Sequence, residues 1–196
     1  MPSEASEGAV LGFDTSGPWI AAALIRGDAV LAQREMALAK GQGEALMPLL
    51  EALLEEAGLG WAELSAIGAG TGPGNFTGIR LTIAAARGLA LGLRIPAIGV
   101  DRFEAMALNG PALPVVIPAL RGQVWVRAPG AAPVLHDTAP GEGIGDTLTP
   151  PAQKLAVAIA RLADARRHAP APRPAPLYLR EADAAPPSEA PPVLLD

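Results

Sequence analysis

Two short segments hold the residues best suited to binding a phosphate or a nucleotide. One is Asp14-Thr15-Ser16, directly after an apolar run, and the other is the glycine loop from Gly72 to Thr77. A glycine loop that leads into a helix offers unpaired N–H groups and the positive end of the helix dipole to an anion. The candidate residues for such a site are Asp14, Thr15, Ser16, Gly72, Gly74, Asn75 and Thr77.

Each segment also has a plainer interpretation. The loop lacks the Lys-Ser/Thr pair of a Walker A site, and Thr77 stands where a dinucleotide fingerprint has its third glycine. The glycines can equally form a tight turn that lets a strand and a helix pack closely. The Asp14 segment can equally satisfy the backbone groups of a hairpin turn, and for this segment we favour that interpretation.

The pattern of apolar runs and turns predicts a mixed sheet with helices on both faces. The expected strands are 9–13, 19–25, 29–33, 66–69 and 96–100, and the expected helices are 44–57, a segment ending at Leu93 and a segment ending at Leu108. Asn75 or Thr77 is expected to cap the second helix, and Asp101 the third. This order of elements matches the ribonuclease H-like domain of actin-like ATPases and sugar kinases.

A proline-containing stretch from Asn109 is predicted to separate two domains, 1–108 and 109–196. The second domain is expected to be a reduced α/β domain with a hairpin over 115–120 and 123–128 and a helix over 152–168. Its proline-rich tail is expected to be extended, with Leu177-Tyr178-Leu179 as the part that docks.

Composition limits the classes of protein to which the chain can belong. Half of the 196 residues are hydrophobic, the net charge is −5, and there is no cysteine. These values predict a globular protein without disulfides or thiolate metal sites, and they disfavour nucleic-acid binding by charge alone. No apolar run looks long enough to span a bilayer, and the acidic start is unlike a signal peptide. We therefore expect a cytoplasmic protein with no membrane contact.

Several motifs resemble those of the TsaB family. Gly72-Pro-Gly-Asn-Phe-Thr-Gly-Ile-Arg80 resembles the family's GPGSFTGLR signature, with Asn75 in place of Ser and Ile79 in place of Leu. Asp14-Thr15-Ser16 fits the opening turn of the family, Leu120 to Trp125 its hairpin, and Pro176-Leu-Tyr-Leu-Arg180 its C-terminal motif. The resemblance implies an actin-like ATPase or ribonuclease H-like fold.

The resemblance also implies a role without catalysis. TsaB is the non-catalytic partner of the transferase TsaD, which modifies the adenosine beside the anticodon of tRNA with a threonylcarbamoyl group. It implies a TsaD-like partner, a TsaE-like ATPase in the same complex and tRNA contact only through that complex, and it leaves open whether the isolated chain is a monomer or a homodimer. It implies no firmly bound cofactor and leaves ATP or ADP at the interface of the complex open. The alternative is an autonomous actin-fold ATPase or small-molecule kinase.

Metal ligands are missing where the catalytic relative has them. TsaD holds its metal with a histidine pair after the first strands, whereas the matching segment from Lys40 to Met47 contains no histidine. His136 and His168 lie far along the chain and are expected to be surface residues. The sequence therefore predicts no metal site and no enzymatic activity of the chain by itself.

The two long helices carry more apolar surface than one buried face requires. The second is apolar almost all round, and an apolar helix face left in water is typical of a subunit interface. We expect these helices to form a four-helix contact with the partner. The expected contact residues are Leu46, Met47, Leu50, Leu54, Ile79, Ile83, Ala86, Arg87 and Ala90.

Overall fold

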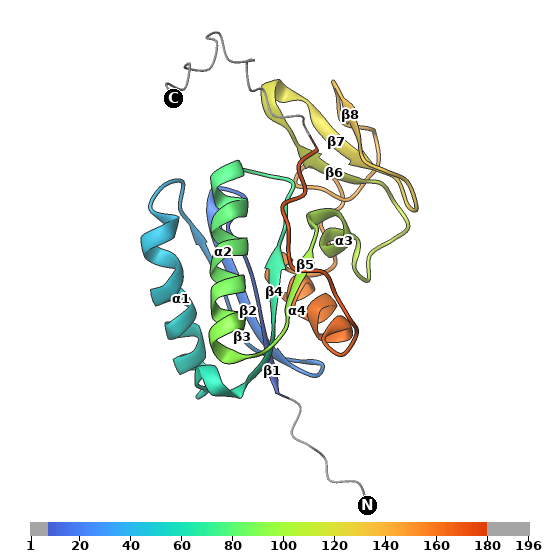
Figure 1. Cartoon of the computed structure of the whole chain (residues 1–196). Coiled ribbons are helices and arrows are strands. Elements are labelled where there is room, and N and C mark those ends of the chain that lie inside the picture. The colour runs from blue at the N-terminus through green and yellow to red at the C-terminus, as the bar shows by residue number, and fades with distance from the viewer. Residues whose placement is uncertain (1–7, 180–196) are drawn as a thin grey trace, which may run out of the picture.

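The main sheet has five strands in the order β3-β2-β1-β4-β5. Its strands are β1 (Ala9–Asp14), β2 (Trp19–Arg26), β3 (Ala29–Ala37), β4 (Leu64–Gly70) and β5 (Ala97–Val100). β1 pairs antiparallel with β2 and parallel with β4, so the sheet is mixed, as predicted. The computed structural model describes residues 8–179 of the chain (Figure 1).

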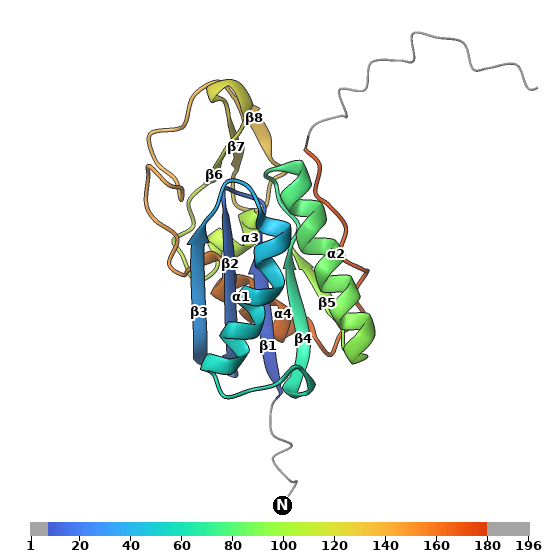
Figure 2. The ribbon, with the colours of Figure 1, turned by 90° about the vertical axis from the view of Figure 1, so that its left-hand side faces the viewer.

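Helices cover both faces of this sheet. They are α1 (Gln42–Glu56), α2 (Phe76–Leu93), α3 (Arg102–Ala107) and α4 (Leu155–Arg166), and short 3-10 turns span Trp61–Glu63 and Leu120–Gly122. α1 and α2 lie side by side on one face (Figure 2), and α4 packs on the other face against β1, β2 and β4. The predicted fold class, ribonuclease H-like with helices on both faces, is confirmed.

Close packing of α4 depends on two glycines that face each other in the sheet. Gly12 of β1 and Gly68 of β4 are register partners. A Cβ atom at Gly12 would lie 2.6 Å from the Ala160 nitrogen, and one at Gly68 would lie 2.9 Å from the Ile159 oxygen. The backbone of α4 therefore sits nearly on the sheet, and its inward residues are small (Ala156, Ala158, Ala160 and Ala163, all buried).

The second sheet is small and antiparallel. Its strands are β6 (Val115–Pro118), β7 (Val124–Arg127) and β8 (Val134–His136), in that order. The β6–β7 hairpin was predicted, whereas β8 and the buried Ile144 lie within the Pro/Gly-rich stretch. The division into 1–108 and 109–196 stays a prediction. α4 follows that boundary in the sequence yet packs on the first sheet.

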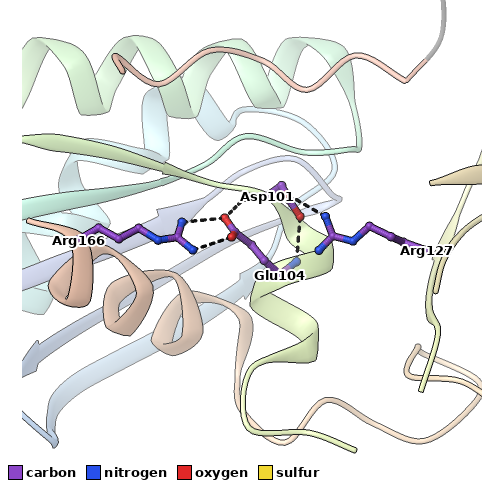
Figure 3. Close-up of polar contacts among 4 residues, drawn as sticks. All are labelled: Asp101, Glu104, Arg127 and Arg166. Carbon is purple, nitrogen blue, oxygen red and sulfur yellow. Dashed lines mark hydrogen bonds and ion pairs between the residues drawn. The ribbon is translucent and has the colours of Figure 1, made fainter. Parts of the chain in front are cut away.

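A chain of ion pairs joins the second sheet to α3 and α4 (Figure 3). Arg127 of β7 donates to the Asp101 carboxylate at 3.0 Å, and Asp101 and Glu104 form the capping box of α3. Arg166 of α4 donates to both oxygens of Glu104, at 3.1 and 2.7 Å. Its hydrogen bond to Glu104 raises the pKa of Arg166. The predicted Asp101 cap thus also fixes how the two sheets meet.

By length and composition alone, α2 is long and apolar enough to cross a membrane, with a mean hydropathy of 1.3 over 18 residues. It is the one such helix within residues 8–179. The prediction that no apolar run is long enough to span a bilayer is therefore wrong. Its inward residues, which include Ile79, Thr82 and Ala86, are buried against the chain's own sheet, as they are in a core helix.

Candidate functional site

The turn after β1 and the glycine loop after β4 meet, as the sequence predicted. The Asn75 nitrogen donates to the Ser16 carbonyl oxygen at 2.6 Å. The Thr15 hydroxyl donates to the Gly78 carbonyl oxygen at 2.7 Å, and the Thr15 amide donates to the Thr82 hydroxyl at 2.9 Å. Parallel strands β1 and β4 end at the same edge of the sheet, which is why the two segments are neighbours.

Inside the turn, most polar groups bind one another, whereas the second carboxylate oxygen of Asp14 is buried and has no hydrogen-bond partner among the described residues. Asp14, Thr15 and Ser16 are all buried. One carboxylate oxygen of Asp14 accepts from the Ser16 amide at 2.9 Å and from the Ser16 hydroxyl at 2.8 Å. The indole N–H of Trp19 also donates to it at 3.3 Å. Both hydroxyl groups of the turn are therefore engaged within the chain.

The backbone of the loop lies in close contact with the backbone of the turn at two glycines. A Cβ atom at Gly78 would collide with the Thr15 carbonyl oxygen, and one at Gly74 would collide with that of Ser16. Asn75 caps α2, as predicted, because its side chain accepts from the Gly78 amide at 3.0 Å. Thr77 is exposed. At Gly74 and Gly78 the loop backbone lies in contact with the turn. The nucleotide site stays a prediction, and we derive no chemistry from it.

A small cavity of about 160 Å³ lies beside the turn, lined by Trp19, Ala21, Glu35, Arg102, Met106, Asp146 and Leu155. Arg102 is only 7% exposed, and its guanidinium lies 5.3 Å from the centre of the Trp19 ring. One of its terminal nitrogens donates to the Pro73 carbonyl oxygen at 3.1 Å. Arg102 therefore ties the glycine loop to α3, and this link had no signature in the sequence.

The predicted contact face of α1 and α2 needs a correction. Apart from Met47 and Arg87, every residue expected there is buried by the chain's own sheet: Leu46, Leu50, Leu54, Ile79, Ile83, Ala86 and Ala90. These residues form the core side of the helices and are not available at the surface. The exposed side of α2 instead carries Ala84, Gly88 and Leu91, which we call the α2 ridge. Leu91 is 82% exposed.

The segment 174–179 runs beside α2 and docks as predicted. The Leu177 amide donates to the Thr71 carbonyl oxygen at 2.9 Å, and Leu177 and Leu179 pack on the core of the second sheet. Tyr178, between them, stacks on Phe76 with 5.4 Å between ring centres. The Arg80 Nε donates to the Tyr178 hydroxyl at 2.9 Å. Alternation along an extended segment explains why Tyr178 points away from the core.

The five-stranded mixed sheet, with helices on both faces and a turn that meets a glycine loop, defines a protein of the ribonuclease H-like, actin-like ATPase type. The family model described as TsaD, tRNA N6-adenosine threonylcarbamoyltransferase, matches residues 36–184. The chain therefore belongs to this family, and its resemblance to the TsaB proteins is confirmed by the relatives that follow.

Two curated relatives carry the name tRNA threonylcarbamoyladenosine biosynthesis protein TsaB. The Bacillus subtilis protein is 34% identical over 120 residues, which cover 59% of this chain and 52% of the relative. The Escherichia coli protein is 34% identical over 98 residues, which cover 50% of this chain and 42% of the relative. The chain thus spans about half the length of these curated relatives.

A solved structure, YeaZ from Pseudomonas aeruginosa, superposes with a TM-score of 0.54 and 28% identity. The superposition covers 61% of this chain and 57% of YeaZ. The names of the curated relatives connect the family to tRNA threonylcarbamoyladenosine biosynthesis. Within residues 8–179, no group of three His, Cys, Asp or Glu side chains has the arrangement of a metal site.

Proposed function

We propose that this chain is the non-catalytic subunit that pairs with a TsaD-type transferase during threonylcarbamoyladenosine modification of tRNA. The observation that carries the proposal is the α2 ridge, an uncovered row of helix surface in a family whose members are named for this modification. Ala84, Gly88 and Leu91 recur at i, i+4 and i+7, the spacing of one helix face. Small residues at two of these positions allow another helix to approach closely.

Partly buried apolar residues of α1 and α2 lie close to the ridge and extend its apolar surface. Leu81, Ala85 and Leu89 of α2 pack toward the core cluster that α1 shares, and Met47 of α1 is half-buried beside them. A partner helix that lies over Leu91 would therefore also approach the side of α2 that carries Leu81, Ala85 and Leu89. The same surface would serve a second copy of the chain when no transferase is present. These two pairings are alternatives, because they use one face.

The polar turn supports an accessory role rather than nucleotide chemistry. Ser16 binds Asp14 within the turn, and Thr15 binds Gly78 and Thr82 of α2, as expected for a turn that fixes the helix on the sheet. We keep a TsaE-like ATPase in the complex, ATP or ADP at its interface and a cytoplasmic location as predictions. The chain would then contribute surface to the complex, and the transferase would contribute the catalytic groups.

The test is co-elution of the full chain with the TsaD-type transferase of the same organism, followed by tRNA modification with and without the chain. Leu91→Glu should abolish the heterodimer on size-exclusion chromatography with light scattering, because it places a charge in the centre of the contact. The control is Val134→Glu, at a valine of β8 that is 55% exposed. An unchanged heterodimer with Leu91→Glu, or nucleotide turnover by the isolated chain, would overturn the proposal.

A further inference from the structure

We propose that Phe76, Tyr178 and Arg80, together with Arg87, form a surface that binds unpaired bases and phosphates of the tRNA substrate beside the partner contact. This inference rests on the proposed function and adds to it the place where this subunit touches RNA. We call these four residues the aromatic–arginine surface. Phe76 and Arg80 lie in the first two turns of α2, Arg87 lies further along the same helix, and Tyr178 belongs to the segment 174–179, which runs beside α2 (Figures 1 and 2).

The aromatic pair is unusual for its exposure. Phe76 is 53% exposed and Tyr178 is 46% exposed, whereas the other aromatic side chains of the described residues are buried or half-buried. The two rings are stacked with an angle of 22° between their planes. The Arg80 guanidinium lies 3.9 Å from the centre of the Phe76 ring. Stacked aromatic rings with a guanidinium are the chemistry on which unpaired bases stack in RNA-binding proteins.

This part of the chain carries only positive charge, although the net charge of the whole chain is −5. From Leu64 to Val100 there is no acidic residue, and the only charged residues are Arg80, Arg87 and Arg94. Within the described residues, none of these three arginines forms an ion pair. α1, in contrast, exposes acidic residues at Glu44, Glu51, Glu55 and Glu56. An RNA backbone is therefore attracted to α2 and repelled from α1.

The aromatic–arginine surface and the α2 ridge are adjacent strips of the helix, since Arg87 and Leu91 are one turn apart. At 100° per residue, Phe76, Arg80 and Arg87 fall within about 40° of one another. Residues Leu81, Ala85 and Leu89 lie on the opposite flank, toward α1, and the ridge lies between the two flanks. A partner seated on the ridge and on α1 would leave the arginine flank at its edge. In the proposed complex, the RNA would therefore lie against the rim of the transferase contact.

The backbone holds Tyr178 in place for this role. Pro174 is buried against Gly99, and the Leu177 amide is bonded to Thr71 at the end of β4. Leu177 and Leu179 fix the segment on either side of Tyr178 by packing inward. The Tyr178 ring is thus presented on an ordered backbone, which lowers the conformational entropy lost on binding.

The experiment measures binding of a labelled anticodon stem–loop RNA, with an adenosine beside the anticodon, to the heterodimer at several salt concentrations. Phe76→Leu with Tyr178→Leu keeps apolar bulk but removes both rings, and Phe76→Tyr with Tyr178→Phe keeps the rings. Arg87→Gln removes one cation of the surface. The matched control is Arg26→Gln, at an exposed arginine that ends β2 on another part of the molecule. Heterodimer formation is measured separately for every variant by size-exclusion chromatography.

Removal of the rings should weaken RNA binding about tenfold, the effect of one lost base stack, and should leave the salt dependence unchanged. The ring-keeping variant and the Arg26 control should bind as wild type. Arg87→Gln should lower the slope of log affinity against log salt by about 0.7, the value for one phosphate contact on a single strand. Ultraviolet cross-linking of the wild-type heterodimer should attach the RNA to the peptides that contain Phe76 or Tyr178.

Other results would overturn the inference in distinguishable ways. If the ring-free heterodimer forms normally and binds RNA as wild type, or if cross-links map elsewhere, the RNA surface is refuted and the proposed function stands. If removal of the rings prevents heterodimer formation, the surface is a protein contact and the RNA assignment is wrong. If the wild-type chain does not pair with the transferase, the proposed function and this inference fail together.

Discussion

Thr82→Val is the sharpest test of whether the turn after β1 is structural. The Thr82 hydroxyl accepts from the Thr15 amide at 2.9 Å and shares a hydrogen bond with the Thr15 hydroxyl at 2.8 Å. Both residues are 0% exposed. Valine keeps the shape and the β-branching of threonine but offers no acceptor. The substitution therefore removes these two hydrogen bonds and very little packing.

The cost follows from the group that loses its partner. A buried amide without an acceptor costs about 1–3 kcal/mol, and the lost hydroxyl pair adds about 1 kcal/mol. We expect Thr82→Val to lower the free energy of unfolding by about 2–4 kcal/mol, which is a large part of the stability of an ordinary domain. The matched control is Thr77→Val in the first turn of the same helix, where the side chain is exposed. It should change the stability by less than about 0.5 kcal/mol.

The assay is urea unfolding followed by circular dichroism, with Thr15→Val and the double variant completing a cycle. The Thr15 and Thr82 hydroxyls share one bond, so the double variant should cost less than the sum of the single variants. A loss below about 0.5 kcal/mol for Thr82→Val would refute the reasoning, because a buried acceptor cannot be removed at no cost.

Two further substitutions test the packing of the sheet and the ion pairs. Gly12→Ala should destabilise the fold by about 1–3 kcal/mol in the same urea assay, because a methyl group would push against the backbone of α4. Gly43→Ala, where a Cβ meets nothing within 4 Å, should instead stabilise α1 by up to about 1 kcal/mol. Glu104→Gln should cost at most about 1 kcal/mol, because the Arg166 pair is partly exposed, and the cost should shrink with added salt. Since the pKa of Arg166 is raised, its contribution is lost only in strong alkali, so unfolding should show no step from Arg166 across neutral pH.

Much of the main sheet could be predicted because its signals are local. Turn residues at Asp14 and Arg26 bound the first strands, and Asn75 and Asp101 mark the starts of α2 and α3 as caps. β8 could not be found, since it has three exposed residues inside a stretch rich in proline and glycine. β8 forms only because it pairs with β7, and a local sequence pattern does not show which strands pair.

The buried side of α2 could not be predicted for a different reason. Hydrophobic periodicity identifies the inward face only when the other face is polar. Ala84, Gly88 and Leu91 are uncharged, as are the buried Ile83, Ala86 and Ala90. The sequence pattern therefore does not show which of these two sides of α2 faces the sheet. The rotation of α2 on the sheet is set by contacts from outside the helix, and the hydrogen bond between Thr15 and Thr82 is one of them.

The residues that looked suited to holding a phosphate are the ones that give α2 its orientation. Asn75 caps the helix and bonds to Ser16, Gly78 lies on Thr15, and Thr82 accepts from Thr15, so the cap and the first two turns of α2 are tied to the end of β1. A helix fixed in this way presents its ridge and its arginine flank at a constant angle. Because an interface gains affinity when its surface is rigid before binding, the contacts that fix α2 would also favour the proposed pairing with the transferase. Loosening the turn, as in Thr82→Val, should therefore weaken pairing with the transferase even though Thr82 is buried and cannot touch a partner. Equal affinity of wild type and Thr82→Val at a temperature where both are folded, measured by isothermal titration calorimetry, would show that the turn does not orient α2.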